Sequence, residues 1–242
     1  MLNVVKKIQN KINGNYDYQG VTIAFLGDSV TQGCFEVYRK SEECIETVFD
    51  KTSAYHKYFT DIFSVLCPSV PVNVINAGIS GGSVQHALSR LERDVIAYNP
   101  DLVVVCFGLN DSCSGLEGLF DYINGLKVIF EKIALCGADV IFMTPNMKCS
   151  YVSCHLKDDL VREVALENVN NQCDGLMDKY IDSAIELCNS MNVPVCDCYK
   201  KWKCLAECGV DTTELLANKI NHPTREMNWM FAYSLVETIF GL

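Results

Sequence analysis

The sequence lacks the features that mark membrane-bound and nucleic-acid-binding proteins. No stretch of the 242 residues approaches the roughly 20 consecutive apolar residues that span a bilayer. The first twenty residues contain no apolar core long enough for a signal peptide. Lys and Arg total 20 against 30 Asp and Glu, which gives a formal net charge of −10, whereas nucleic acids and anionic membranes are bound by clustered basic residues. We therefore expect a cytoplasmic protein that binds neither nucleic acid nor membrane.

Cysteine, in contrast, is abundant, with fourteen residues. In a chain without an export signal these are expected to be reduced thiols. Four of them fall between Cys196 and Cys208, but no C-x2-C pair is present and Cys196 lies in an apolar, strand-like segment. These cysteines therefore fit small buried apolar side chains better than zinc ligands, and we predict no metal site.

Strand-like and helix-like segments alternate along the chain. Short apolar runs rich in β-branched residues predict buried strands at residues 21–26, 72–76, 102–107, 138–143 and 193–196. Amphipathic patterns predict helices at residues 54–67, 84–98, 119–135, 171–191 and 225–240. This alternation is typical of a parallel sheet with helices on both faces. Since no repeat or linker interrupts it, we predict one domain over residues 1–242, with residues 1–20 as an N-terminal extension.

Residues suited to acyl transfer follow the predicted strands. Ser29 follows the first strand, Gly78 the second and Asn110 the third, while His222 precedes the last helix. In α/β sheets of this type, ligands bind at the carboxyl ends of the strands. Ser29 would be a nucleophile and His222 its base, and the backbone N–H groups of Ser29 and Gly78 with the Asn110 amide would form an oxyanion hole. Each residue alone also has a structural explanation, such as a helix cap at Ser29.

Two acidic residues flank these positions. Asp28 precedes Ser29 and is expected to hold the nucleophile turn. Asp111 follows Asn110 and is expected to cap a helix or brace the loop. Both are therefore assigned supporting roles.

Four short motifs together resemble the SGNH hydrolases, also called the GDSL esterase/lipase family. Gly27-Asp28-Ser29-Val30 is similar to the family's first block, with Val in place of Leu. Gly78 in N-A-G-x-S-G, Asn110 in G-L-N-D and His222 in N-H-P match later blocks. The resemblance implies a three-layer α/β/α sandwich with a five-stranded parallel, flavodoxin-like sheet ordered 2-1-3-4-5. It also implies a carboxylic ester hydrolase without a cofactor.

The chain departs from the family at the residue that orients the histidine. The family places an Asp three residues before the His, and that position is Lys219 here. Three alternatives remain: Asn218 accepts a hydrogen bond from His222, a backbone carbonyl does so, or Asp211 folds back toward the ring.

The substrate is less well defined. Two long segments, residues 33–53 and 146–170, mix polar and aromatic side chains and would carry specificity at the active face. This mixture favours an acyl ester of a carbohydrate, with acetyl as the expected acyl group, as a small-molecule or glycan substrate. The alternatives are a lysophospholipase or acyl-thioester hydrolase, a non-catalytic ligand-binding relative, and a nucleotide binder, for which no P-loop Lys or G-x-G-x-x-G motif is present. The oligomeric state is not predicted.

Overall fold

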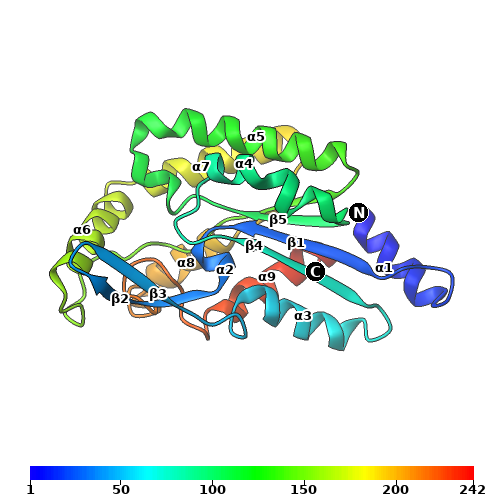
Figure 1. Ribbon diagram of the computed structural model, residues 1–242, viewed down its shortest axis with the longest axis horizontal. Helices are drawn as coiled ribbons and strands as arrows, with labels where there is room; N and C mark the ends of the chain where they lie inside the picture. Colours follow the sequence, from blue (N-terminus) through cyan, green and yellow to red (C-terminus); the bar gives the residue numbers. More distant parts are fainter.

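The computed structural model describes residues 1–242. The fold has three layers, and the middle layer is a five-stranded parallel sheet with helices on both faces (Figure 1). The sheet order is β4-β1-β5-β6-β7, which is the predicted 2-1-3-4-5 order of strands along the chain. These strands are β1 (Val21–Gly27), β4 (Val72–Gly78), β5 (Leu102–Cys106), β6 (Asp139–Met143) and β7 (Val195–Cys196). The predicted fold class is therefore confirmed.

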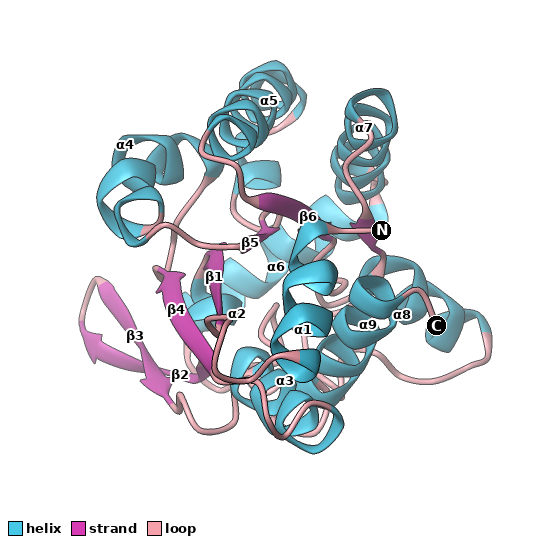
Figure 2. Ribbon diagram, turned by 90° about the vertical axis from the view of Figure 1, so that its right-hand side faces the viewer, coloured by secondary structure: helices cyan, strands magenta, loops and turns pink.

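Helices cover both faces of this sheet (Figure 2). One face carries α4 (Val84–Asp94), α5 (Leu119–Leu135) and α7 (Leu176–Met191), and the other carries α1 (Asn3–Asn13), α3 (Tyr55–Leu66), α8 (Cys198–Glu207) and α9 (Asn228–Phe240). The remaining elements are α2 (Ser29–Gln32), α6 (Asp159–Cys173), the hairpin strands β2 (Cys34–Ser41) and β3 (Cys44–Phe49), and short 3-10 turns at Ile96–Tyr98, Asp111–Ser114 and Leu116–Gly118.

The central strands are buried on both faces, which explains their continuous apolar sequences. In β1, Ile23 and Phe25 belong to the larger core cluster, which also includes residues of α1, α3, α8 and α9. Ala24 and Leu26 point to the opposite side and join the cluster that includes residues of α4, α5 and α7. Alternate side chains of one strand therefore belong to two separate hydrophobic cores.

Two predictions of local structure were wrong. The predicted helix 171–191 corresponds to α7, but its first three residues belong to a separate helix, α6, which the sequence did not predict and which Gly175, with φ +73°, separates from α7. The segment 33–53, in which the sequence predicted no strand, contains the antiparallel β2–β3 hairpin. Its strands are only partly buried, so the apolar alternation that identifies a strand is weak there.

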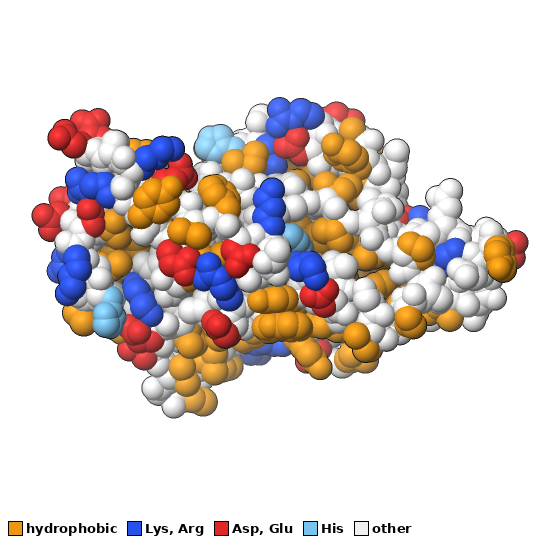
Figure 3. Space-filling view, turned by 60° about the horizontal axis from the view of Figure 1, so that its bottom comes forward, with side chains coloured by type: hydrophobic (Ala, Val, Ile, Leu, Met, Phe, Trp, Pro, Cys, Tyr) orange, Lys and Arg blue, Asp and Glu red, His pale blue; other side chains and the backbone are white.

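No helix is both long enough and apolar enough to cross a bilayer. On the face shown in Figure 3, acidic and basic side chains are interspersed with small apolar areas. The negative net charge is therefore not concentrated on that face.

Candidate active site

The nucleophile candidate lies in a one-turn helix at the carboxyl end of the central strand β1. Ser29 is the first residue of α2, and Asp28 caps this helix by accepting a hydrogen bond from the N–H of Val30 at 3.0 Å. Gly33, with φ +92°, ends the turn in a left-handed conformation that glycine adopts without strain. The Ser29 side chain is thus fixed at the strand end, and only 4% of the residue's surface is exposed.

Two glycines allow this short helix to lie directly against the sheet. A Cβ atom on Gly27 would lie 2.0 Å from Thr31 Oγ1, and one on Gly78 would lie 2.3 Å from the backbone nitrogen of Gln32. Any larger residue at either position would push α2 away from the ends of β1 and β4. The G-D-S and N-A-G sequences therefore have a steric basis as well as a chemical one.

A buried arginine joins the same two strand ends from the other side. Arg90 of α4 donates to the carbonyl oxygen of Ala77 at 2.6 Å and to that of Gly27 at 3.1 Å. It also pairs with Asp94 at 3.2 Å. Arg90 therefore holds together the residues that precede Ser29 and Gly78.

The tertiary structure brings Ser29 and His222 together across 193 residues of chain. His222 Nε2 lies 2.9 Å from Ser29 Oγ, and His222 Nδ1 lies 2.8 Å from the carbonyl oxygen of Phe35 in β2. A carbonyl oxygen can only accept a hydrogen bond, so Nδ1 carries the proton in the neutral ring. Nε2 then presents its lone pair to the serine hydroxyl, which is the tautomer a general base needs.

The partner of Nδ1 is therefore the backbone carbonyl, one of the three alternatives that the sequence left open. Asn218 has a different role, because its Oδ1 accepts hydrogen bonds at 2.9–3.0 Å from the backbone N–H groups of Ile220, Asn221 and His222. The alternative in which Asp211 folds back is wrong, since its carboxylate binds the hydroxyl of Tyr151 at 2.7 Å.

Lys219 also points elsewhere. It has a left-handed backbone, with φ +57°, and its Nζ pairs with Glu214 at 2.9 Å. The position that carries the family's Asp thus contributes nothing to the histidine.

The three candidate oxyanion donors lie at neighbouring strand ends, but two of them already have acceptors. The N–H of Gly78 donates to Asn76 Oδ1 at 3.0 Å, and Asn110 Nδ2 donates to the carbonyl oxygen of Gly82 at 2.9 Å. The amide of Asn110 has a second N–H for a ligand. The N–H of Ser29, in the first turn of α2, has no partner within its own helix.

Burial dominates the electrostatics of the site. It lowers the pKa of His222 to about 4, although the Phe35 carbonyl and the Glu36 carboxylate oppose this shift. Burial also raises the pKa of Asp28 to about 7, with a contribution from the charge of Asp111, whose own pKa burial raises to about 6. The histidine is therefore neutral near pH 7 and able to accept a proton.

The two carboxylate oxygens of Asp111 accept hydrogen bonds from the N–H groups of Val84 at 2.8 Å and Gly108 at 3.1 Å. Asp111 thus links the start of α4 to the loop that carries Asn110. Lys148 is fully buried, and its Nζ donates to Cys113 Sγ at 3.4 Å. Burial lowers the pKa of this lysine.

A family model for the GDSL-like lipase/acylhydrolase family matches residues 25–229, which include the strand ends just described. The chain belongs to this family.

The chain is also similar to one curated protein, and its fold is similar to those of solved structures. An acetylxylan esterase of Geobacillus stearothermophilus is 33% identical over 92 residues, which is 38% of this chain and 40% of that protein. The match thus spans less than half of the relative's length. A crystal structure of an acetylxylan esterase from the same organism has a TM-score of 0.65 at 22% identity, covering 91% of this chain and 94% of that one. The acetyl xylan esterase AlAXEase has a TM-score of 0.67 at 18% identity, covering 90% and 100%.

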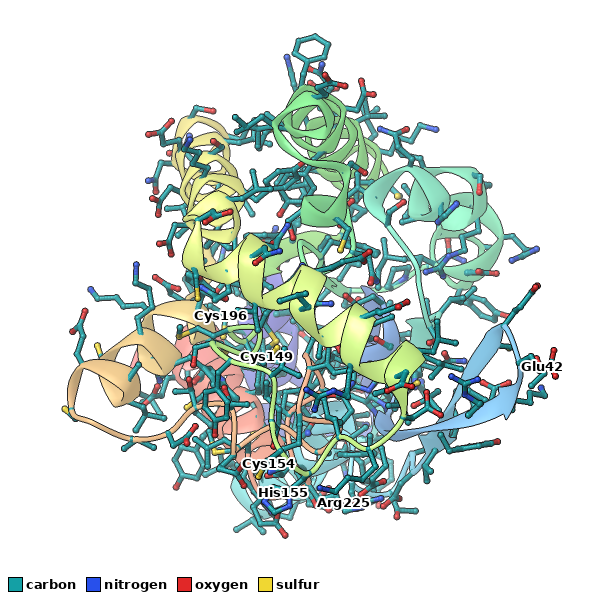
Figure 4. The ribbon with its side chains drawn as sticks, turned by 90° about the vertical axis from the view of Figure 1, so that its left-hand side faces the viewer. Glu42, Cys149, Cys154, His155, Cys196 and Arg225 are labelled. Carbon is teal, nitrogen blue, oxygen red and sulfur yellow. The ribbon has the colours of Figure 1, made fainter.

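The cysteines are dispersed in this member of the family. All fourteen are free thiols, and no group of three or more His, Cys, Asp or Glu side chains is arranged to hold a metal ion. Cys196 and Cys198 are buried with their sulfurs 3.9 Å apart, whereas Cys204 and Cys208 are exposed. Figure 4 shows Cys149 and Cys196 inside the fold and Cys154 with His155 nearer its edge.

Sequence reasoning missed several groups around the site. No sequence pattern marks the Phe35 carbonyl, because every residue has a backbone carbonyl oxygen. Arg90 could be read only as a charged residue on an amphipathic helix. Arg225 lies three residues after His222 and forms ion pairs with Glu36 and Asp50, contacts that depend on where the hairpin lies.

Proposed function

We propose that this protein is a serine carboxylic ester hydrolase that uses Ser29 and His222 as a catalytic dyad. The observation that carries the proposal is the 2.9 Å contact between Ser29 Oγ and His222 Nε2 in a ring whose other nitrogen donates to the Phe35 carbonyl. This is the geometry in which a neutral imidazole can activate a hydroxyl.

The reaction would proceed in two acyl-transfer steps. His222 removes the proton from Ser29 Oγ as this oxygen attacks the ester carbonyl carbon, which gives a tetrahedral oxyanion. His222 then protonates the leaving alcohol, and the acyl group remains on Ser29. Water repeats the sequence, with His222 again as the base, and releases the carboxylic acid.

The oxyanion would be stabilised by the N–H groups of Ser29 and Gly78 and by the Asn110 amide. The Gly78 N–H donates to Asn76 in the free protein. To bind the oxyanion, it would have to form a bifurcated hydrogen bond or give up its bond to Asn76. Asn110 can contribute its second N–H without breaking its bond to Gly82.

The absence of a carboxylate beside Nδ1 distinguishes this site from the usual triad. Catalytic mutants of the Geobacillus acetylxylan esterase replace a serine, a histidine and an aspartate three residues before that histidine. Lys219 occupies the equivalent spacing here, and the Phe35 carbonyl takes over the orienting hydrogen bond. A neutral carbonyl stabilises the imidazolium less than a carboxylate does, so the dyad is expected to be slower than a triad.

The proposed substrate is an acetyl ester of a carbohydrate. The similar proteins named above are acetylxylan esterases, and a cavity of about 330 Å³, which neither Ser29 nor His222 lines, adjoins the loop that carries Asn110. It is lined by Ser83, Gln85, Asp111, Ser114, Glu117, Gly118, Asp121 and Tyr122. Hydroxyl-rich groups are bound by side chains of this kind.

The test is hydrolysis of p-nitrophenyl acetate together with labelling by a fluorophosphonate. Ser29→Ala and His222→Ala should abolish both, whereas Ser89→Ala and His86→Ala, on the exposed surface of α4, should leave them unchanged. Hydrolysis by Ser29→Ala at the wild-type rate would refute the mechanism. A preference for acyl chains of eight or more carbons would refute the acetyl specificity and favour a lysophospholipase or thioesterase.

A further inference from the structure

The hydrogen bond that orients His222 comes from an irregular point in the β2–β3 hairpin. The hairpin register shifts between Cys34 and Val37, so Phe35 and Glu36 lie in a bulge that lacks regular ladder pairing. This bulge leaves the Phe35 carbonyl free to accept from His222 at 2.8 Å. It also means that strand pairing alone does not fix the position of this carbonyl.

One side chain contacts the bulge from the histidine's own segment. Arg225 lies three residues after His222 and donates to both carboxylate oxygens of Glu36, at 2.6 and 3.1 Å. Its Nε donates to Asp50 at 3.0 Å, and its guanidinium lies 4.3 Å from the centre of the Phe35 ring. Arg225 thus touches the side chain of Phe35 and of the residue that follows it.

Asp50 extends this set of contacts to the other end of the hairpin. Its N–H donates to the carbonyl oxygen of Gly33 at 2.8 Å, which ties the residue after β3 to the residue before β2. In Figure 4, Glu42 marks the hairpin turn, and Arg225 lies well away from it, toward the ends that join the hairpin to the rest of the chain. The contacts of Arg225 are therefore concentrated where the carbonyl must be held.

We propose that Arg225 is a positioning residue for catalysis: it fixes the Phe35 carbonyl, and through it the imidazole of His222, by binding Glu36 and Asp50 and stacking on Phe35. The proposal rests on the proposed Ser29–His222 dyad. A bidentate guanidinium fork and a ring contact define both distance and orientation. Displacement of the carbonyl by about 1 Å would release Nδ1–H and let the ring turn away from Ser29, a misplacement that can cost about 10²-fold in rate.

The chain offers a matched control on the same hairpin. Arg39 forms a bidentate pair with Asp158, at 2.6 and 2.9 Å, which joins the far part of β2 to the start of α6. The side chains of Arg39 and Arg225 are similarly exposed, at 38% and 33%. Arg39→Ala therefore removes an equivalent ion pair from the hairpin without touching Phe35.

The experiment compares Arg225→Ala, Arg225→Lys and Arg39→Ala with the wild type by steady-state kinetics on p-nitrophenyl acetate, by melting temperature and by NMR of the imidazole N–H protons. Arg225→Ala is expected to lower kcat about 10²-fold with KM within about twofold, and to weaken or remove the His222 Nδ1–H signal through solvent exchange. Arg225→Lys keeps the charge but not the fork, so it should restore little of the lost activity. Arg39→Ala should retain kcat and the Nδ1–H signal.

Two results would overturn the proposal. One is an Arg225→Ala protein, or an Arg225→Lys protein if the first does not fold, that keeps both kcat and the Nδ1–H signal. The other is an equal loss in Arg39→Ala, which would mean that the hairpin as a whole matters and not the contact at Phe35. Hydrolysis by Ser29→Ala would refute the dyad instead, and the Nδ1–H signal, which needs no substrate, would still decide the role of Arg225.

Discussion

The carboxyl group of Asp28, beside Ser29, is expected to destabilise the fold at neutral pH. Asp28 is 1% exposed, and one of its oxygens accepts the capping hydrogen bond from Val30 at 3.0 Å. Asp28→Asn keeps an oxygen for this bond, since Asn and Asp are equivalent helix caps. The substitution therefore removes the ionisable group and little else.

The size and sign of the effect follow from the pKa of Asp28, which burial raises from 3.8 to about 7. Between these values the folded protein binds the proton and the unfolded chain does not, so stability falls as the pH rises from about 4 to 7. A difference of about three pKa units corresponds to a loss on the order of 4 kcal/mol above pH 7. Asp28→Asn should be more stable than the wild type by up to that amount at pH 8 and equally stable near pH 4.

Urea denaturation of the proteins at several pH values between 3 and 8 measures this difference. His222 and His56, whose pKa values burial lowers to about 4, titrate in both proteins and cancel in the comparison. Asp158 is a control of opposite sign: it also caps a helix, α6, but Arg39 lowers its pKa. Relative to the wild type, Asp158→Asn should therefore be less stable at pH 8, and this difference in stability should be smaller at pH 3. A stability gain of Asp28→Asn that does not change between pH 4 and pH 8 would refute the reasoning.

Three further outcomes test the site. Asn110→Ala should lower kcat on an acetyl ester about 10²–10³-fold, because it removes one of the proposed oxyanion donors; an unchanged kcat would exclude Asn110 from the oxyanion hole. Burial lowers the pKa of His222 to about 4, and only the neutral ring accepts a proton. We therefore expect kcat/KM to rise with pH around 4 and to be constant above pH 6.5. A midpoint of this rise at pH 6.5 or above would contradict the expectation. Asn218→Ala should lower the free energy of unfolding by about 1–3 kcal/mol, since three backbone N–H groups lose their acceptor. Asn218→Asp keeps the acceptor but loses the Nδ2 donor to Asn221 Oδ1 at 3.0 Å, so it should restore only part of the stability in the same denaturation assay.

Much of the fold could be predicted because its elements have strong local signals. Short apolar runs rich in β-branched residues identified all five strands of the sheet, and the helix predicted at 119–135 matches α5 (Leu119–Leu135). The prediction failed where burial is partial or where a break depends on one residue. The hairpin strands are half-exposed, and Gly175 divides a pattern that otherwise continues as one helix.

The sequence by itself determined which side chains could carry the chemistry and where along the chain they occur. Ser29, Gly78 and Asn110 follow strands, and parallel strands bring their carboxyl ends to one edge, so the local pattern is enough to group them. Only the tertiary structure decided how His222 is oriented. Its partner is a backbone oxygen in a bulge 187 residues away, and a backbone oxygen is present at every residue, so no pattern of side chains can distinguish Phe35. The choice depends on the placement of the hairpin and on the contacts of Arg225 that hold it.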